Sequence, residues 1–238
     1  MNVVGLTGHT ERGHDASVAL IQNGEITFLA EEERFTRIRH AYDSFPTNAL
    51  NSCLKFANLK LSDIDYFATG WNYEMWYATH RRVWNKKEYL SFLNGADESK
   101  LILVDHHTAH AASAFFTSGF NDSLILIIDG QGEVNSTSIY TGKDKNVDLV
   151  YAAKASFGYF FSAVTEQCGF EVGEEGKTMG LVPYGKANPK IMEILENHIY
   201  FDEKRGELVQ SFYVTQEEFL DEQDRTIEAW KKIFEPII

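Results

Sequence analysis

Short apolar runs separated by turn residues open the chain and predict strands. The runs occupy residues 3–7, 17–21 and 26–30, and Asn23-Gly24 between the last two is typical of a tight β-hairpin turn. After Pro46, apolar residues recur at helical spacing and predict a helix. Strands at 66–69 and 101–104 and helices over 71–92 and 107–116 complete a βββαβαβα order.

The second half of the chain begins with the same order of elements. It predicts a buried strand at 124–128, a turn at 129–132, strands at 136–140 and 147–152, and a helix over 157–168. A helix over 189–196 and a polar, amphipathic tail follow. No further strands are predicted to complete a second sheet.

The repeated order predicts an α/β fold of the actin-like ATPase type (ASKHA/ribonuclease H-like), with duplicated βββαβα halves. We expect a first half-domain at 1–120 and an incomplete second half-domain at 121–238. In this architecture the first hairpin turns of both halves face a cleft that holds nucleotide phosphates. The incomplete second half suggests that the chain is truncated at its C-terminus.

Composition excludes several classes of protein. The 238 residues are 44% hydrophobic and carry a net charge of −13, without a run of Lys and Arg that would indicate nucleic-acid binding. We find neither a signal peptide nor an apolar run long enough to span a bilayer. Cys53 and Cys168 are far apart, which predicts buried thiols in a cytoplasmic protein.

The sharpest chemical motif is the histidine cluster in Asp105-His106-His107-Thr108-Ala109-His110, where a strand passes into a helix. His106 and His110 are four residues apart, so on a helix they share one face, a spacing that suits a divalent metal. Asp129, at the end of the next strand, adds a carboxylate. The alternative is that the histidines cap the helix, but three histidines in five residues favour a metal.

Three further segments contain candidate catalytic or phosphate-binding residues, and each also has a purely structural interpretation. Gly13-His14-Asp15 lies in the first hairpin turn, where His14 is a candidate base, although this is also an ordinary turn composition. Segment 173–185 predicts a glycine-rich, phosphate-binding loop around Gly176, Lys177 and Gly180 without the P-loop spacing, or else a solvated loop. Arg34 belongs to an arginine-rich segment that suits phosphate, or that forms surface salt bridges.

Together these motifs resemble the N-terminal domain of the O-carbamoyltransferases of the nodulation and aminoglycoside-tailoring type. The resemblance runs from residue 5 to about 187. Each motif alone is a modest indication, but together the motifs are highly specific for this family. The matching segments are 13–17, 32–37, 106–115, 129–133 (Asp129-Gly130-Gln131-Gly132-Glu133) and 176–185.

The resemblance implies a fold, a reaction and roles for residues. Members form carbamoyl-adenylate from carbamoyl phosphate and ATP in a C-terminal YrdC-like domain, which we expect to be absent from this chain. An N-terminal domain similar to the tRNA threonylcarbamoyl-adenosine synthesis proteins then transfers the carbamoyl group to a hydroxyl of a sugar or natural product.

By the same resemblance, His106, His110 and Asp129 would hold a divalent ion, most typically iron, and His14 would be the base. Lys177, Gly176, Gly180, Arg34 and Gly130 would contact nucleotide or phosphate. The family takes a further aspartate from beyond residue 238. We therefore expect a weakened metal site in this chain.

Two other functions are compatible with the sequence. One is a metal- or nucleotide-binding fragment without turnover, and the other is a sugar kinase on the same fold, which the histidine cluster disfavours. The aromatic segment 71–84 suits stacking on a sugar, but its spacing is more typical of a core.

Overall fold

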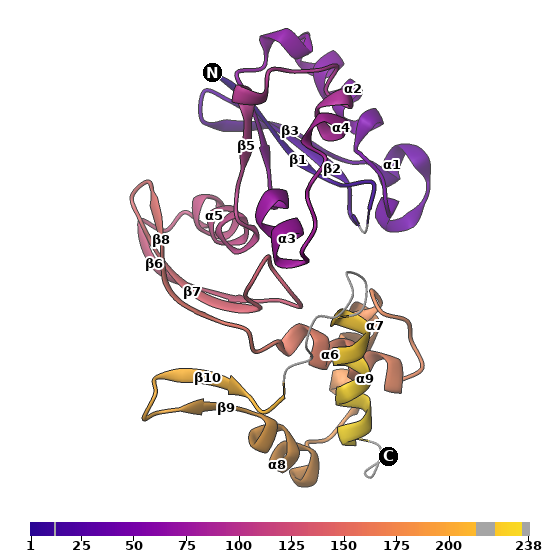
Figure 1. Ribbon diagram of the computed structural model, residues 1–238, viewed down its shortest axis with the longest axis vertical. Coiled ribbons are helices and arrows are strands. Elements are labelled where there is room, and N and C mark those ends of the chain that lie inside the picture. The colour runs from indigo at the N-terminus through magenta and orange to yellow at the C-terminus, as the bar shows by residue number, and fades with distance from the viewer. Residues whose placement is uncertain (12, 213–221, 235–238) are drawn as a thin grey trace. The chain divides into compact units, whose positions relative to one another are not determined.

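The computed structural model describes residues 1–11, 13–212 and 222–234 (Figure 1). The chain forms two compact units, Met1–Ala109 and His110–Ile238. Helix α5 (His106–Ser118) runs through the division without a break. The structure thus divides the chain within this helix, whereas sequence analysis places the boundary between residues 120 and 121.

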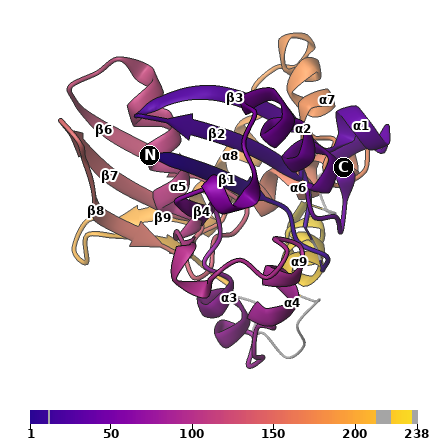
Figure 2. The ribbon, with the colours of Figure 1, turned by 90° about the horizontal axis from the view of Figure 1, so that it is seen from above.

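The first unit contains a five-stranded sheet in the order β3-β2-β1-β4-β5. Figure 2 labels its strands β1 to β4. The strands β1, β2 and β3 form an antiparallel meander, and β4 and β5 extend it in parallel with β1. Asn23 and Gly24 join β2 to β3 with φ angles of 54° and 94°, as the hairpin prediction requires. The strands are β1 (Asn2–Thr7), β2 (Ser17–Gln22), β3 (Glu25–Glu31), β4 (Tyr66–Thr69) and β5 (Leu101–Leu103).

Helix α2 packs against β2 and β3 and buries Leu50 and Cys53. The single helix expected over 71–92 is two short helices, because Asn72 and Asn85 each cap a new helix start with their side chains. The helices of this unit are α1 (Glu33–Thr36), α2 (Thr47–Ala57), α3 (Tyr73–Thr79) and α4 (Lys86–Ser91), with 3-10 turns η1 (Arg39–Ala41), η2 (Leu61–Asp63) and η3 (Glu98–Lys100).

The second unit begins with α5 packed on one face of an antiparallel sheet of β6 (Asp122–Ile128), β7 (Thr137–Lys143) and β8 (Asn146–Ala153). Phe115 of α5 forms one core cluster with Ile125 and Ile127. The prediction that 124–128 is a buried strand is wrong for every second residue. Leu124 and Leu126 are 74% and 61% exposed, because their side chains lie on the face opposite α5.

A second core cluster surrounds the fully buried Trp230, where α6 and α9 pack together. The separate two-stranded sheet of β9 and β10 is absent from the sequence prediction, and parts of the expected tail, 213–221 and 235–238, lie outside the described residues. The remaining elements are α6 (Phe157–Gln167), α7 (Glu175–Leu181), η4 (Val182–Tyr184), α8 (Pro189–His198), β9 (Ile199–Asp202), β10 (Glu207–Gln210) and α9 (Glu222–Phe234).

The structure is therefore a mixed α/β fold whose first unit follows the predicted element order. The second unit repeats the βββα order, but its described residues add no parallel strand to the meander, so a duplication of βββαβα halves is not seen. Cys168 is exposed at the end of α6, contrary to the expectation that both thiols are buried. None of the helices within the described residues is both long and apolar enough to cross a membrane.

Candidate functional site

His106 is held in a defined orientation at the start of α5. Its Nδ1 lies 3.0 Å from the carbonyl oxygen of Gly70, and the indole of Trp71 stacks on the imidazole with ring centroids 4.0 Å apart. A carbonyl oxygen accepts hydrogen bonds only, so Nδ1 carries the proton and the lone pair of the neutral ring is on Nε2. A backbone carbonyl bonded to the other ring nitrogen is the usual partner of a metal-binding histidine.

The start of α5 is itself fixed by contacts within the first unit. Asn72 donates from its amide to Asp105 Oδ1 over 2.9 Å, and Ala109 N donates to Asp105 O over 2.9 Å in the first helical turn. The same Asn72 caps α3. One asparagine thus ties the start of α3 to the residue that precedes His106.

His110 follows one helical turn later and faces Asp129 at the end of β6. The distance from His110 Nε2 to Asp129 Oδ2 is 3.6 Å, which is too long for a hydrogen bond. His107, between the two other histidines, is only 6% exposed. The cluster therefore presents His106 and His110 on one helix face and buries the third histidine.

The donor atoms of His106, His110 and Asp129 fit a divalent metal ion. One ligand atom from each residue lies within 4.8 Å of the other two. Two ligands at typical zinc distances on a tetrahedral ion are roughly 3.4 Å apart. The His110–Asp129 pair already has about this spacing, and the widest pair needs a side-chain shift of roughly 1 Å. Two imidazoles and one carboxylate suit iron, zinc or manganese and leave positions for a substrate oxygen.

The turn that carries Asp129 is tightly packed. Gly130 N donates to Asp129 Oδ1 over 2.6 Å, and Ser156 Oγ donates to Gly130 O over 2.7 Å. A Cβ atom on Gly158 would lie 2.4 Å from Gly130 N. The absence of a side chain at position 158 is therefore what lets the start of α6 pack against this turn.

His14 and Asp15 form a dyad in the connection between β1 and β2. His14 Nδ1 lies 2.8 Å from Asp15 Oδ2, and His40 Nδ1 lies 2.9 Å from Asp15 Oδ1. Burial opposes ionisation of Asp15, but the hydrogen bonds from His40 and His14 outweigh it and lower its pKa. An ionised Asp15 favours the proton of His14 on Nδ1, which makes Nε2 the basic nitrogen.

Arg34 shows the surface salt bridges that the sequence offers as an alternative. Its guanidinium lies 2.7 Å from Glu31 and 3.5 Å from Glu33, and its side chain is 67% exposed. The neighbouring Glu32 is buried and accepts from Asn48 N, Asn48 Nδ2 and Ala49 N at the start of α2. Glu32 therefore supports the fold, and phosphate binding by Arg34 stays a prediction.

The loop expected over 173–185 is wrong, because Gly176, Lys177 and Gly180 lie on helix α7. Thr178, buried, bonds to Thr165 of α6, and these contacts hold the glycine-containing segment in helical form. Lys177 pairs with Glu174 and lies over the ring of Phe170. The Lys177 ammonium group therefore contacts the Glu174 carboxylate from a helix and does not lie in an open loop.

Sequence reasoning missed the residues that orient the candidate site. Trp71 and Gly70 fix His106, and His40 shares Asp15 with His14. Trp71 is an aromatic residue two positions after the end of strand β4, and this local feature could have identified it. No local signal identifies His40, because its contact with Asp15 spans 25 residues.

Comparison with known proteins gives one family. The family model described as "Carbamoyltransferase N-terminus" matches residues 5–92 and 78–236. Nodulation protein NolNO of Sinorhizobium fredii is 31% identical over 228 residues, covering 84% of this chain and 33% of that protein. Nodulation protein U of Rhizobium tropici is 24% identical, covering 81% of this chain and 40% of that protein. The chain thus spans about one third of the length of such relatives.

Similarity to solved structures is weaker. YeaZ from Pseudomonas aeruginosa aligns with a TM-score of 0.36 at 16% identity, covering 63% of this chain and 66% of that one. Component A of the (R)-2-hydroxyglutaryl-CoA dehydratase of Acidaminococcus fermentans aligns with a TM-score of 0.41 at 12% identity, covering 100% of this chain and 90% of that one.

Proposed function

Because the chain belongs to the carbamoyltransferase N-terminus family, we propose that it is the part of a carbamoyltransferase that transfers the carbamoyl group to a hydroxyl acceptor. The donor in this proposal is carbamoyl-adenylate, which a YrdC-like domain makes from carbamoyl phosphate and ATP. The proposal includes an actin-like arrangement of the complete protein. The family match over most of the chain is the observation that carries it.

In the proposed reaction the acceptor oxygen attacks the carbamoyl carbon, so that a new C–O bond forms. The bond from that carbon to the phosphate oxygen breaks, and AMP leaves with the electron pair. His14 Nε2 takes the proton of the acceptor hydroxyl. Asp15 orients the imidazole of His14 through Nδ1 over 2.8 Å, so that Nε2 is the nitrogen available to the acceptor hydroxyl.

His106, His110 and Asp129 are the residues that would hold a divalent ion, for which iron is our proposal. When bound, such an ion supplies positive charge beside an anionic leaving group. The protein contributes the orientation of the ligands, since Gly70 and Trp71 fix the His106 ring. The tightly packed turn with Gly158 fixes the backbone of Asp129.

The metal proposal is tested by elemental analysis of protein purified without chelator. We expect the wild type to bind iron, manganese or zinc at less than one ion per chain, because the described residues supply only three candidate ligands, and we expect His110→Ala to lose most of this metal. His80→Ala is the matched control, because His80 contacts Trp76 O at the end of α3 and is not one of the three donors. Equal metal content in both variants, or no metal in the wild type, would overturn the metal site.

The transfer proposal is tested with synthetic carbamoyl-adenylate and a panel of hydroxyl acceptors. The chain is assayed alone and together with a separately supplied YrdC-like domain, with detection of the carbamate ester by mass spectrometry. His14→Gln should lower the rate by roughly 10²- to 10⁴-fold, the usual contribution of a general base. If the wild type carbamoylates no acceptor under either condition, the chain is a binding fragment without turnover.

A further inference from the structure

The proposed base His14 is held only weakly by its own surroundings. Its side chain is 64% exposed, so packing does not keep the imidazole in one orientation. The hydrogen bond to Asp15 is therefore what orients the ring. The Asp15 side chain is itself 55% exposed, and exposed side chains change rotamer rapidly unless a further contact holds them. The orientation of His14 thus depends on what holds Asp15.

His40 is the second partner of the Asp15 carboxylate. Its Nδ1 lies 2.9 Å from Asp15 Oδ1, whereas His14 Nδ1 lies 2.8 Å from Asp15 Oδ2. An ionised carboxylate accepts hydrogen bonds and donates none, so both Nδ1 atoms carry protons. Each carboxylate oxygen thus has one imidazole donor, and a rotation of the carboxylate toward solvent would break both hydrogen bonds.

His40 is better fixed than either His14 or Asp15. Its side chain is only 26% exposed, and its ring packs on that of Tyr42 with centroids 5.4 Å apart. His40 N donates to Glu33 Oε2 over 2.8 Å, and His40 O accepts from Asp15 N over 2.6 Å. The exposed fraction therefore falls from His14 to Asp15 to His40, so the most buried member of the three can support the other two.

The backbone on both sides of His14 is tied to the segment that carries His40. Asp15 N donates to His40 O, and Asp43 N donates to Gly13 O over 2.8 Å. Asp15 and His40 have φ angles of 53° and 62°, in the left-handed region, where Asn, Asp and His occur more often than other side chains. Two backbone hydrogen bonds thus keep His40 beside Asp15.

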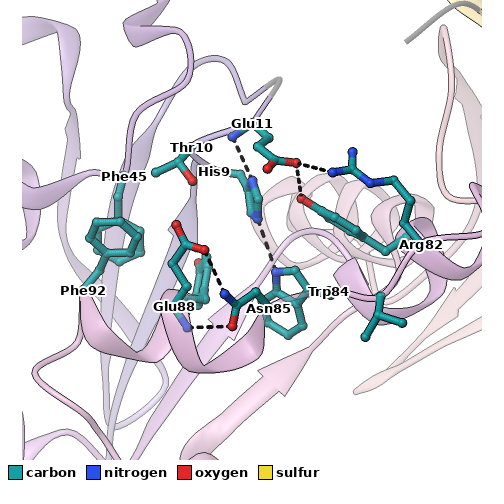
Figure 3. Close-up of a pocket in the computed structure, with 12 residues that line it drawn as sticks. His9, Thr10, Glu11, Phe45, Arg82, Trp84, Asn85, Glu88 and Phe92 are labelled. Carbon is teal, nitrogen blue, oxygen red and sulfur yellow. Dashed lines mark hydrogen bonds and ion pairs between the residues drawn. The ribbon is translucent and has the colours of Figure 1, made fainter. Parts of the chain in front are cut away.

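The earlier part of the connection between β1 and β2 has contacts that do not involve His40. Figure 3 shows His9 and Glu11 beside a small cavity that Trp84 also borders. Trp84 Nε1 lies 3.2 Å from His9 Nε2, and Glu11 accepts from the Tyr77 hydroxyl over 2.9 Å. Tyr77 and Trp84 are buried, which confirms the expectation that the aromatic segment mainly forms core. A variant of His40 should therefore leave this part of the connection in place.

We propose that His40 is a positioning residue for carbamoyl transfer, which holds Asp15 so that one carboxylate oxygen faces His14 Nδ1. With the proton of His14 fixed on Nδ1, Nε2 carries the lone pair that the acceptor hydroxyl needs. In this proposal His40 acts through Asp15 and does not contact the acceptor. The role in transfer rests on the proposed function, whereas the effect of His40 on the tautomer of His14 does not.

The test compares two variants that both tolerate the φ angle of 62° at position 40. His40→Gly removes the imidazole, whereas His40→Asn keeps an N–H donor near the place of Nδ1. Long-range ¹H–¹⁵N NMR at alkaline pH gives the tautomer of the neutral His14 ring, whose signal is assigned with His14→Gln. We expect the Nδ1–H tautomer in the wild type and in His40→Asn, and a mixture with the Nε2–H tautomer in His40→Gly.

The control for the NMR measurement is His80→Asn, since His80 contacts Trp76 O at the end of α3 and not Asp15. This variant should leave the tautomer of His14 as in the wild type. The proposal is overturned if His14 has the same tautomer in the wild type and in His40→Gly, or if His80→Asn changes it as much as His40→Gly does.

Carbamoyl transfer from synthetic carbamoyl-adenylate gives the second readout. In His40→Gly, kcat should fall by roughly tenfold to hundredfold, as expected for a misplaced catalytic group, with little change in the KM for the acceptor. His40→Asn should recover most of this loss. Equal losses in the two variants, or none in His40→Gly, would overturn the positioning role. The expected change of tautomer without transfer by any variant, wild type included, contradicts only the proposed function.

Discussion

The two antiparallel meanders of the chain start alike but differ in what covers them. The meander β1–β3 continues into the parallel strands β4 and β5, and Leu20 and Phe67 are fully buried. The meander β6–β8 gains no such strands within the described residues, and Leu126 of its first strand is 61% exposed. Strands with similar apolar sequences are thus buried to different extents, because the burial of a strand depends on the elements that pack against it.

The first turns of the two meanders differ in a way that bears on chemistry. Asp15 is within hydrogen-bond distance of two histidines, at 2.8 and 2.9 Å. Asp129 lies 3.6 Å from His110, with a spacing that suits two ligands of one ion. This difference is the reason why our proposal places proton transfer at the first turn and metal binding at the second.

The largest effect on stability is expected from truncating Leu20, a buried leucine of the first sheet. The comparison is truncation of Leu126, an exposed leucine of the second sheet. Leu20→Ala should destabilise the first unit by about 2–5 kcal/mol, because it leaves a cavity in a packed core. Leu126→Ala should change stability by less than about 0.5 kcal/mol, as expected for an exposed side chain. Urea unfolding measures both, and equal losses for the two variants would contradict the difference in burial.

An intermediate effect is expected at the turn of the second meander. Gly158→Ala places a Cβ atom 2.4 Å from Gly130 N, so the turn or α6 must shift, at about 1–3 kcal/mol. The bound metal should decrease as Asp129 moves. The control is Gly180→Ala on α7, where a Cβ atom meets nothing within 4 Å and should stabilise the helix by about 0.5–1 kcal/mol. Unfolding and metal content that match the wild type in Gly158→Ala would refute this account.

The smallest effect is expected from pH at the turn of the first meander. The folded pKa of Asp15 is lowered from 3.8, so its stabilisation is present above that pH and is lost as the pH falls through the lowered value. Asp15→Asn should make the acid-side decrease in urea midpoint shallower than in wild type. The change should be small because the Asp15 side chain is 55% exposed.

Asp148→Asn serves as the control for this measurement, because Asp148 is exposed on β8 of the second sheet. An acid-side slope that changes equally in both variants would show that general charge, rather than the two histidine contacts of Asp15, causes the effect.

The local sequence was sufficient for most elements and for the metal candidates. Alternating apolar runs and Asn23-Gly24 determine the first meander, and the i, i+4 spacing places His106 and His110 on one helix face. These features depend on residues close in sequence, where strand and helix periods act directly. The same reasoning failed at 173–185, where contacts of Thr178 with α6 outweigh the low helix propensity of glycine.

What surrounds the candidate groups follows from the packing of strands and helices in space. The amino-acid order alone places His14, His106 and Asp129 after predicted strands and His110 one helical turn after His106. It did not determine that Trp71 stacks on His106, that His40 shares Asp15, or that Glu88 and His9 border one cavity. These contacts join residues that are 25 or more positions apart, and such contacts depend on how strands and helices pack rather than on any local pattern.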